Sequence, residues 1–190
     1  MIQGGAGTST NMNANEVIAN IGLELMGHKK GEYKFLHPNN DVNLSQSTND
    51  AYPTALRVAL YEKLGELNES MAIIKTSFAK KAAEFKDIIK MGRTQLQDAV
   101  PMTLEQEFRT YAVMIGEDIQ RVSEARQLVR EMNMGATAIG TGINAHPDYA
   151  KTVEAKLQEV TGRPFVTAGD LIEATQDTGA YVQISGVLKR

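Results

Sequence analysis

Three short stretches of the sequence carry neutral hydrogen-bonding side chains that could hold an oxygen-rich anion. They are residues 8–11 (TSTN), 47–49 (STN) and 94–95 (TQ). Hydroxyl and amide donors can bind a carboxylate, and they can also stabilise the charge that develops when a proton leaves the adjacent carbon. None of the stretches contains a histidine, and the nearby Asp50 and Asp98 are expected to act as caps or structural partners. The residues alone therefore suggest an anion site without an evident general base.

The second stretch comes directly before the longest helical pattern in the chain. Pro53 follows it, and proline suits a first helical turn because its missing N–H would have no partner there. We therefore expect Ser47, Thr48 and Asn49 just ahead of a helix N-terminus, where unpaired N–H groups and a partial positive charge favour an anion. The same residue types are common helix caps. A capping cluster and a carboxylate cradle both remain open on these residues.

Two long amphipathic patterns predict the scaffold. In the first, from Pro53 to about Phe85, apolar residues recur at spacings of three and four, which predicts a helix of roughly 50 Å at 1.5 Å per residue. The second begins at Thr103, where Gln106 completes a capping box, and Asp118 is a polar interruption in its apolar seam. Two long helices joined by a loop pack antiparallel. The expected fold class is mainly α, a long-helix bundle with a short helical and loop N-terminal piece.

The remaining elements are shorter. A helix is expected from Asn13 to Gly27, with the apolar side chains of Val17, Ile18, Ile21 and Leu25 on one face. Residues 28–44 and 90–101 are predicted to be loops, and residues 135–142 a Gly/Thr-rich turn. Further helices are expected at 147–161 and from Asp170 to the last residue, Arg190. No strand is predicted.

Composition excludes several classes of protein. The net charge is −3 and no Lys/Arg cluster is dense, so a nucleic-acid partner is not expected. No apolar run reaches about 18 residues, so no membrane span is predicted. The chain has no cysteine and its three histidines are scattered, which argues against a metal site. These features predict a cytoplasmic protein.

Four segments resemble motifs of the aspartase/fumarase superfamily. They are residues 4–13 (GGAGTSTNMN), 45–50 (SQSTND), 92–99 (GRTQLQDA) and 135–142 (GATAIGTG). The resemblance extends over essentially all 190 residues. Ser47-Thr48-Asn49 is aspartase-like, since fumarases usually have Ser-Ser-Asn, and Gln95 stands where fumarases typically carry His. The longer Gly-rich first segment also favours the aspartase branch.

The resemblance implies an enzyme, a carbon–nitrogen lyase that converts L-aspartate to fumarate and ammonia by anti elimination without a cofactor or metal. It implies substrate-binding roles for Thr8, Ser47, Thr48, Asn49, Thr94 and Gln95. The first three would hold the carboxylate that becomes an aci-carboxylate as the Cβ proton leaves, and the last three would lie on the amino-group side. Fumarate hydration is the alternative activity within the superfamily.

One departure from the family pattern concerns the general base. In the family the base is a Ser in a Gly-Ser-Ser loop, followed by a Lys and an Asn, and no such stretch occurs in this sequence. The resemblance therefore predicts no catalytic residue in this chain, which would be an internal fragment truncated at Arg190 and inactive alone. Residues 1–50 would close the family's N-terminal domain, and residues 51–190 would begin the central bundle.

The family also implies an assembly. Its members are homotetramers in which each active site draws loops from three subunits, around a core of the long helices. The long apolar stripes of this chain leave a further alternative open, that it serves only as a helical oligomerisation module.

Overall fold

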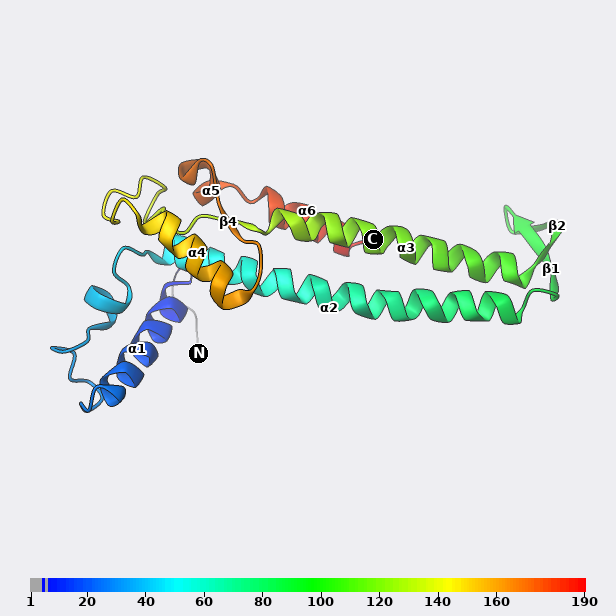
Figure 1. Ribbon diagram of the computed structural model, residues 1–190. Coiled ribbons are helices and arrows are strands. Elements are labelled where there is room, and N and C mark those ends of the chain that lie inside the picture. Colours follow the sequence, from blue (N-terminus) through cyan, green and yellow to red (C-terminus); the bar gives the residue numbers. More distant parts are fainter. Residues whose placement is uncertain (1–4, 6) are drawn as a thin grey trace. The chain divides into compact units, whose positions relative to one another are not determined.

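The computed structural model describes residue 5 and residues 7–190, and it is mainly α-helical, as predicted (Figure 1). Its elements in chain order are α1 (Thr8–Leu25), the π-helical turn η1 (Pro38–Val42), α2 (Thr48–Glu84), β1 (Ile89–Thr94), β2 (Gln97–Thr103), α3 (Leu104–Leu128), β3 (Glu131–Met132), α4 (Tyr149–Thr161), β4 (Val166–Thr167), α5 (Leu171–Gln176) and α6 (Gly179–Leu188). The chain forms two compact units, residues 1–60 with 129–179 and residues 61–128 with 180–190. The family-based boundary between residues 50 and 51 stays a prediction. None of the described helices is long and apolar enough to cross a membrane.

The first unit is built around a small apolar core. Phe165, Leu23, Met132 and Val129 are its largest fully buried apolar side chains. The short strands β3 and β4 pair in parallel, with Glu131 opposite Val166 and Met132 opposite Thr167. This pairing holds the start of the segment that carries residues 133–142 beside β4.

Helix α1 begins at Thr8, five residues earlier than the sequence indicates. The polar stretch 8–11 therefore forms its first turn, while residues 1–4 and 6 lie outside the described residues. The buried face is made by Asn15, Ala19 and Leu23. It contacts the segment after the helix, because Asn15 donates to Asn43 at 2.9 Å and Asn20 donates to Tyr33 at 3.1 Å.

The face of α1 that the sequence marks as apolar is largely open in this chain. Val17, Ile18 and Ile21 are each about half exposed, and Leu25 is 85% exposed. Asn15 and Asn20 lie against the irregular segment because it offers them hydrogen-bonding partners at Asn43, Tyr33 and Gly31. Segment 28–44 is irregular as predicted, apart from η1, which His37 caps by accepting from the N–H groups of Asn39 and Asn40.

The second unit is an antiparallel helix pair, which confirms the predicted arrangement (Figure 1). Contacts run in opposite order along the two helices. The Asn68 amide donates to Ser123 at 2.8 Å, and farther along α2 the Phe78 ring lies 5.3 Å from the Tyr111 ring. At the far end Phe85 packs edge-on against Phe108 at 5.1 Å. The expected stripe is only partly covered: Leu64 and Ala82 are buried, whereas Ile74 remains 47% exposed.

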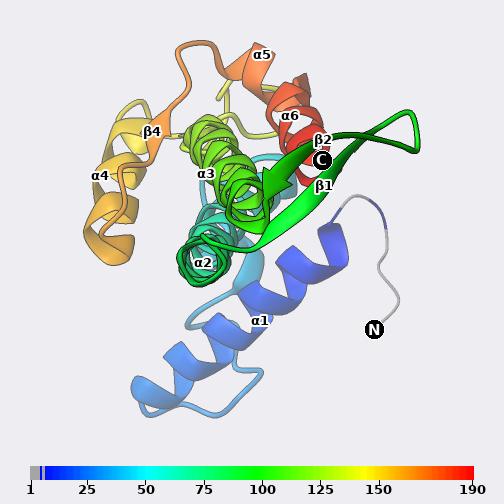
Figure 2. The same cartoon turned by 90° about the vertical axis from the view of Figure 1, so that its right-hand side faces the viewer.

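The segment expected to be a loop at 90–101 is a β-hairpin instead (Figure 2). Strands β1 and β2 pair antiparallel from Ile89 opposite Thr103 to Thr94 opposite Gln97. The prediction was wrong because no residue of the hairpin is buried, so no buried face imposes the apolar alternation by which a strand is recognised. At its base the predicted capping box of α3 is present, with Gln106 N–H donating to Thr103 Oγ1 at 3.2 Å and Thr103 N–H to Gln106 Oε1 at 3.0 Å.

The C-terminal helical stretch is two helices rather than one. Asp170 caps α5, accepting from the N–H groups of Ile172 and Glu173 at 2.9 and 3.1 Å, and Asp177 interrupts the helix before α6. Its side chain accepts from Gly179 N–H at 2.9 Å, which starts a new helix. Helix α4 ends at Gly162, which has φ +64°, as its glycine stop signal indicates.

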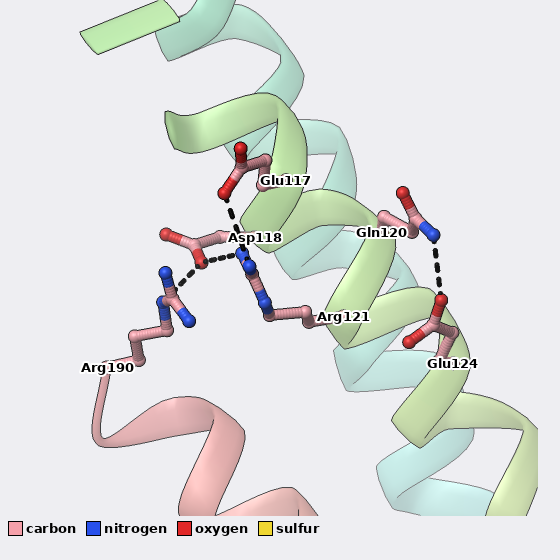
Figure 3. A network of polar contacts seen from close by, with 6 residues as sticks. All are labelled: Glu117, Asp118, Gln120, Arg121, Glu124 and Arg190. Carbon is pink, nitrogen blue, oxygen red and sulfur yellow. Dashed lines mark hydrogen bonds and ion pairs between the residues drawn. The ribbon is translucent and has the colours of Figure 1, made fainter. Parts of the chain in front are cut away.

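Asp118 in the α3 seam has an ionic role (Figure 3). Its Oδ1 lies 3.0 Å from Arg121 Nη1 and 3.0 Å from Arg190 Nε, so it joins α3 to the end of α6. Arg121 also pairs with Glu117 at 3.2 Å. The polar interruption in the seam is thus a salt-bridged junction within the second unit.

Candidate functional site

The N-terminus of α2 is the centre of the candidate site. The helix begins at Thr48, so Thr48 and Asn49 belong to its first turn rather than preceding it. Ser47 caps it: its Oγ accepts from Asn49 N–H at 3.2 Å, and its own N–H donates to Asp50 Oδ1 at 2.8 Å. This reciprocal pair satisfies backbone donors at the helix start and leaves the positive end of the helix dipole beside Ser47 and Thr48.

Pro53 lies inside α2, not in its first turn. Because it has no N–H, the carbonyl of Asn49, four residues earlier, lacks the usual helical donor. That carbonyl accepts from Asn133 Nδ2 at 3.0 Å. The proline therefore leaves a free backbone acceptor at the start of α2, to which a side chain from the segment after β3 donates a hydrogen bond.

The first turn of α1 lies beside the first turn of α2. Asn11 Nδ2 donates to Thr48 Oγ1 at 3.1 Å. Gly7, with φ +98°, packs so closely on Tyr52 that an added Cβ would lie 2.5 Å from its ring. Thr8 follows Gly7 directly and is exposed. Two helix N-termini with their hydroxyl residues thus come together, which suits a carboxylate or another small anion.

Segment 133–138 is joined to the start of α2 by further hydrogen bonds. Asn49 Nδ2 donates to the carbonyl of Ala138 at 2.7 Å, and Thr137 N–H donates to Asp50 Oδ2 at 2.9 Å. Asp50 is fully buried, and burial raises the pKa of its carboxyl although its hydrogen bonds from Ser47 and Thr137 lower it. Asp50 is therefore a structural bridge, as its expected role as a cap or partner indicates.

A hollow of about 450 Å³ opens beside this junction. It is lined by residues from both sides of the junction: Ser45, Gln46, Ser47, Thr137, Ala138, Ile139, Thr141, Ile143 and Asn144. The Tyr149 side chain hydrogen-bonds that of Gln46, and burial together with the Asp50 charge raises the pKa of its hydroxyl to about 12. Tyr149 is therefore a neutral hydrogen-bonding group at pH 7 rather than a base.

Thr94 and Gln95 belong to the second unit, at the end of the hairpin. Gln95 and Leu96 form its two-residue turn, with φ +47° and +62°. The backbones of both residues are in the left-handed region, which residues other than glycine enter at a cost of about 1–2 kcal/mol. Beside the turn Asp98 pairs with Arg93 at 3.0 Å, in keeping with its expected structural role.

Asn133 and Thr137, which hold the start of α2, were not among the site residues predicted from the sequence. One signal was available. Thr137 lies in the segment GATAIGTG, where three glycines in eight residues indicate a tight backbone, and the structure gives it a φ of +58°, an outlier for Thr. Among the described residues no cluster of His, Asp and Glu side chains could hold a metal ion.

Comparisons with known proteins agree with this geometry. A family model described as "Lyase" matches residues 1–190. Aspartate ammonia-lyase of Helicobacter pylori (strain ATCC 700392 / 26695) is 70% identical over 190 residues, which are 100% of this chain and 41% of that protein. The Escherichia coli (strain K12) aspartate ammonia-lyase is 58% identical over 188 residues, or 99% of this chain and 39% of that protein. The chain thus spans about two fifths of the length of these relatives.

Solved structures show the same fold. The fumarate lyase:delta crystallin from Brucella melitensis bound to cobalt has a TM-score of 0.97 at 52% identity, covering 99% of this chain and 41% of that one. Recombinant class II fumarase from Schistosoma mansoni has a TM-score of 0.90 at 30% identity, covering 95% of this chain and 41% of that one. The chain therefore belongs to this lyase family, the aspartase/fumarase superfamily.

Proposed function

We propose that this chain supplies the carboxylate-binding part of an aspartate ammonia-lyase, which converts L-aspartate to fumarate and ammonia. The observation that carries the proposal is the meeting of the α1 and α2 N-termini, with Thr48 bonded to Asn11 and Thr8 beside Gly7. Fumarate formation requires a carboxylate whose negative charge grows as the neighbouring carbon loses its proton. Hydroxyls at helix N-termini supply fixed donors for that charge.

Each predicted site residue has a part in this proposal. Ser47, Thr48 and Thr8 hold the carboxylate next to the reacting carbon. Ser47 Oγ accepts from Asn49 N–H and Thr48 Oγ1 from Asn11, so these two hydroxyls are held in place before the substrate arrives and need little reorganisation to stabilise the aci-carboxylate. Asn49, Thr94 and Gln95 stay predicted contacts for the amino group, which leaves from the face opposite to the departing proton.

The proton acceptor is not among these residues. Asp50 accepts two backbone N–H groups in a fully buried position, and Tyr149 has its pKa raised to about 12. Neither group suits proton abstraction at neutral pH. The proposal assigns this step to a Gly-Ser-Ser loop of the kind that the family carries, so the 190-residue chain alone is expected to release no fumarate.

A chimera tests the proposal. The matching 190 residues of the Helicobacter pylori aspartate ammonia-lyase are replaced by this chain, and fumarate absorbance is followed with L-aspartate or L-malate as the substrate. We expect activity with L-aspartate, and a fall in kcat of about 100-fold or more in Ser47→Ala. Ser77→Ala is the matched control, because Ser77 bonds only the carbonyl of Ile73 on an exposed part of α2.

Two results would contradict the proposal. A chimera that releases fumarate from L-malate but not from L-aspartate would favour the alternative, fumarate hydratase. Unchanged kcat in Ser47→Ala would show that the α2 N-terminus does not hold the reacting carboxylate.

The proposed enzyme is a homotetramer, as the family implies. Exposed apolar side chains on the helix pair support association: Ile73 is 70% exposed, and Val113 and Met114 are each about half exposed. Surfaces of this kind favour burial against another subunit. Light scattering of the chimera tests the prediction, and a monomer that is fully active would refute it.

A further inference from the structure

The start of α2 and segment 133–138 are joined by contacts in both directions. Asn133 Nδ2 donates to the Asn49 carbonyl, Thr137 N–H donates to Asp50, and Asn49 Nδ2 donates to the Ala138 carbonyl. The Asn49 side chain is exposed, so nothing in its own packing determines how its amide is turned. Its orientation follows from the position of the Ala138 carbonyl.

The Ala138 carbonyl is in turn placed by an unusual backbone at Thr137. This residue has φ +58°, is only 7% exposed, and bonds its own Oγ1 to the Ala136 carbonyl at 2.6 Å. A β-branched residue in the left-handed region persists only where its surroundings impose the conformation. The Asp50 carboxylate does so by accepting Thr137 N–H at 2.9 Å.

Asp50 thus bridges two backbones with one buried carboxylate. Oδ1 accepts from Ser47 and Oδ2 from Thr137, so both oxygens are used and neither is available to a ligand. Replacing Asp50 with Asn leaves one acceptor oxygen and turns an NH₂ group against the other N–H. Only one of the two N–H groups then keeps an acceptor, so Asn cannot hold both Ser47 and Thr137, although the volume of the side chain is kept.

From these contacts we infer that Asp50 is a positioning residue for the proposed lyase site, acting through Thr137 and the Ala138 carbonyl to orient the Asn49 amide. With Nδ2 directed to that carbonyl, Asn49 presents its Oδ1 as an acceptor. An acceptor suits a substrate ammonium group better than a carboxylate. This inference rests on the proposed function, because it is tested by the kcat/KM for L-aspartate, whose amino group Asn49 is proposed to contact.

The test uses the active chimera with L-aspartate. Asp50→Asn is expected to lower kcat/KM roughly 10- to 100-fold, the effect of a misplaced site group. In the Asn49→Ala background the same change is expected to have no further effect, because the group on which it acts is gone. Asp41→Asn is the control: Asp41 also accepts a backbone N–H, from His37, but it does not contact segment 133–138.

A second variant separates positioning from folding. Glycine adopts positive φ without strain, so Thr137→Gly is expected to keep the carbonyl of Ala138 in place without help from Asp50. Adding Thr137→Gly to Asp50→Asn should therefore restore at least part of kcat/KM. A loss caused only by removing the hydrogen bond between Asp50 and Ser47 would not be rescued in this way.

The outcomes are distinct from those of the proposed function. An inactive parent chimera would overturn the lyase proposal itself. With an active parent, the positioning role is overturned if Asp50→Asn lowers only the Tm, if its effect adds to that of Asn49→Ala, or if Thr137→Gly rescues nothing. Failure of both Asp50 variants to fold would also overturn it, since loss of a positioning residue leaves the fold intact.

Discussion

Among single side chains, Arg126 is expected to make one of the largest contributions to the stability of the helix pair in the second unit. Its Nε donates to the Tyr61 carbonyl at 2.7 Å, and its guanidinium lies 3.8 Å from the centre of the Tyr61 ring. It can lie flat on α2 because Gly65 has no side chain there. This contact gives a reason for the single glycine in the interior of the long helix, where glycine costs about 1 kcal/mol relative to alanine.

The size of the effect follows from these contacts. A hydrogen bond from a charged donor contributes about 1.5–3 kcal/mol, and a half-buried cation–π contact about 0.5–2 kcal/mol. Arg126→Ala is therefore expected to lower the free energy of unfolding by about 2–5 kcal/mol. Arg109→Ala is the matched control, since Arg109 is 61% exposed and pairs only with Glu105 in the neighbouring turn, a contact of roughly 0–1 kcal/mol.

A double-mutant cycle with Gly65 tests the geometry itself. A Cβ at Gly65 would lie 3.0 Å from Arg126 Nη2 and 3.1 Å from Cζ, so Gly65→Ala is expected to displace the guanidinium and destabilise the wild type. In the Arg126→Ala background the same substitution should instead stabilise by up to about 1 kcal/mol, through helix propensity alone.

The measurement is urea unfolding followed by circular dichroism at one protein concentration for all variants. The reasoning is refuted if Arg126→Ala costs no more than Arg109→Ala. It is also refuted if Gly65→Ala has the same effect in both backgrounds, because the two residues would then not share a contact.

Three further predictions concern other sites. The Asp50 carboxyl has its pKa raised in the folded state, so the folded chain binds more protons than the unfolded one between the ordinary Asp value of about 3.9 and the raised value. The unfolding free energy of the wild type, relative to that of Asp50→Asn, should therefore fall as the pH rises through this window. Thermal denaturation at a series of pH values measures this difference, and a difference that rises with pH would contradict the prediction. Thr103→Ala removes the capping oxygen from Gln106 N–H and should cost about 1 kcal/mol in urea unfolding; no change would show that the capping box is dispensable. Leu96→Asn at the hairpin turn, where φ is +62°, should raise the Tm, because Asn tolerates this conformation better than Leu; a lower Tm would indicate that the exposed Leu96 side chain has a packing role.

The length of α2 was predictable from the sequence, but its first residue was not. The stripe from Leu60 to Phe85 predicted a long helix, and α2 extends from Thr48 to Glu84. Helix length and pairing direction were predictable because periodicity is a local property that many residues report together. The predicted helix start was too late because Pro53 was assumed to lie in the first turn. Pro53 can lie inside the helix because Asn133, which is distant in sequence, donates to the Asn49 carbonyl that the proline leaves without a partner.

The hairpin shows the opposite situation. Residues 89–103 pair as strands without a buried face, and their turn at Gln95 and Leu96 contains no glycine or asparagine. Neither alternation nor turn chemistry therefore distinguishes this segment from a loop. The single helix expected after Asp170 was likewise divided at Asp177, where a local capping bond outweighed a continuing helical pattern.

The sequence by itself determined the helix pair, the caps at Thr103 and Asp170, and the cluster of polar residues at 47–49 that the family resemblance interprets. These features depend on neighbours within a few turns of the chain. Only the tertiary structure decided what holds that cluster in place: Asp50 against Thr137, Asn49 against Ala138, and Asn11 against Thr48. Each of these contacts joins residues between 37 and 89 positions apart, and their formation depends on the fold as a whole.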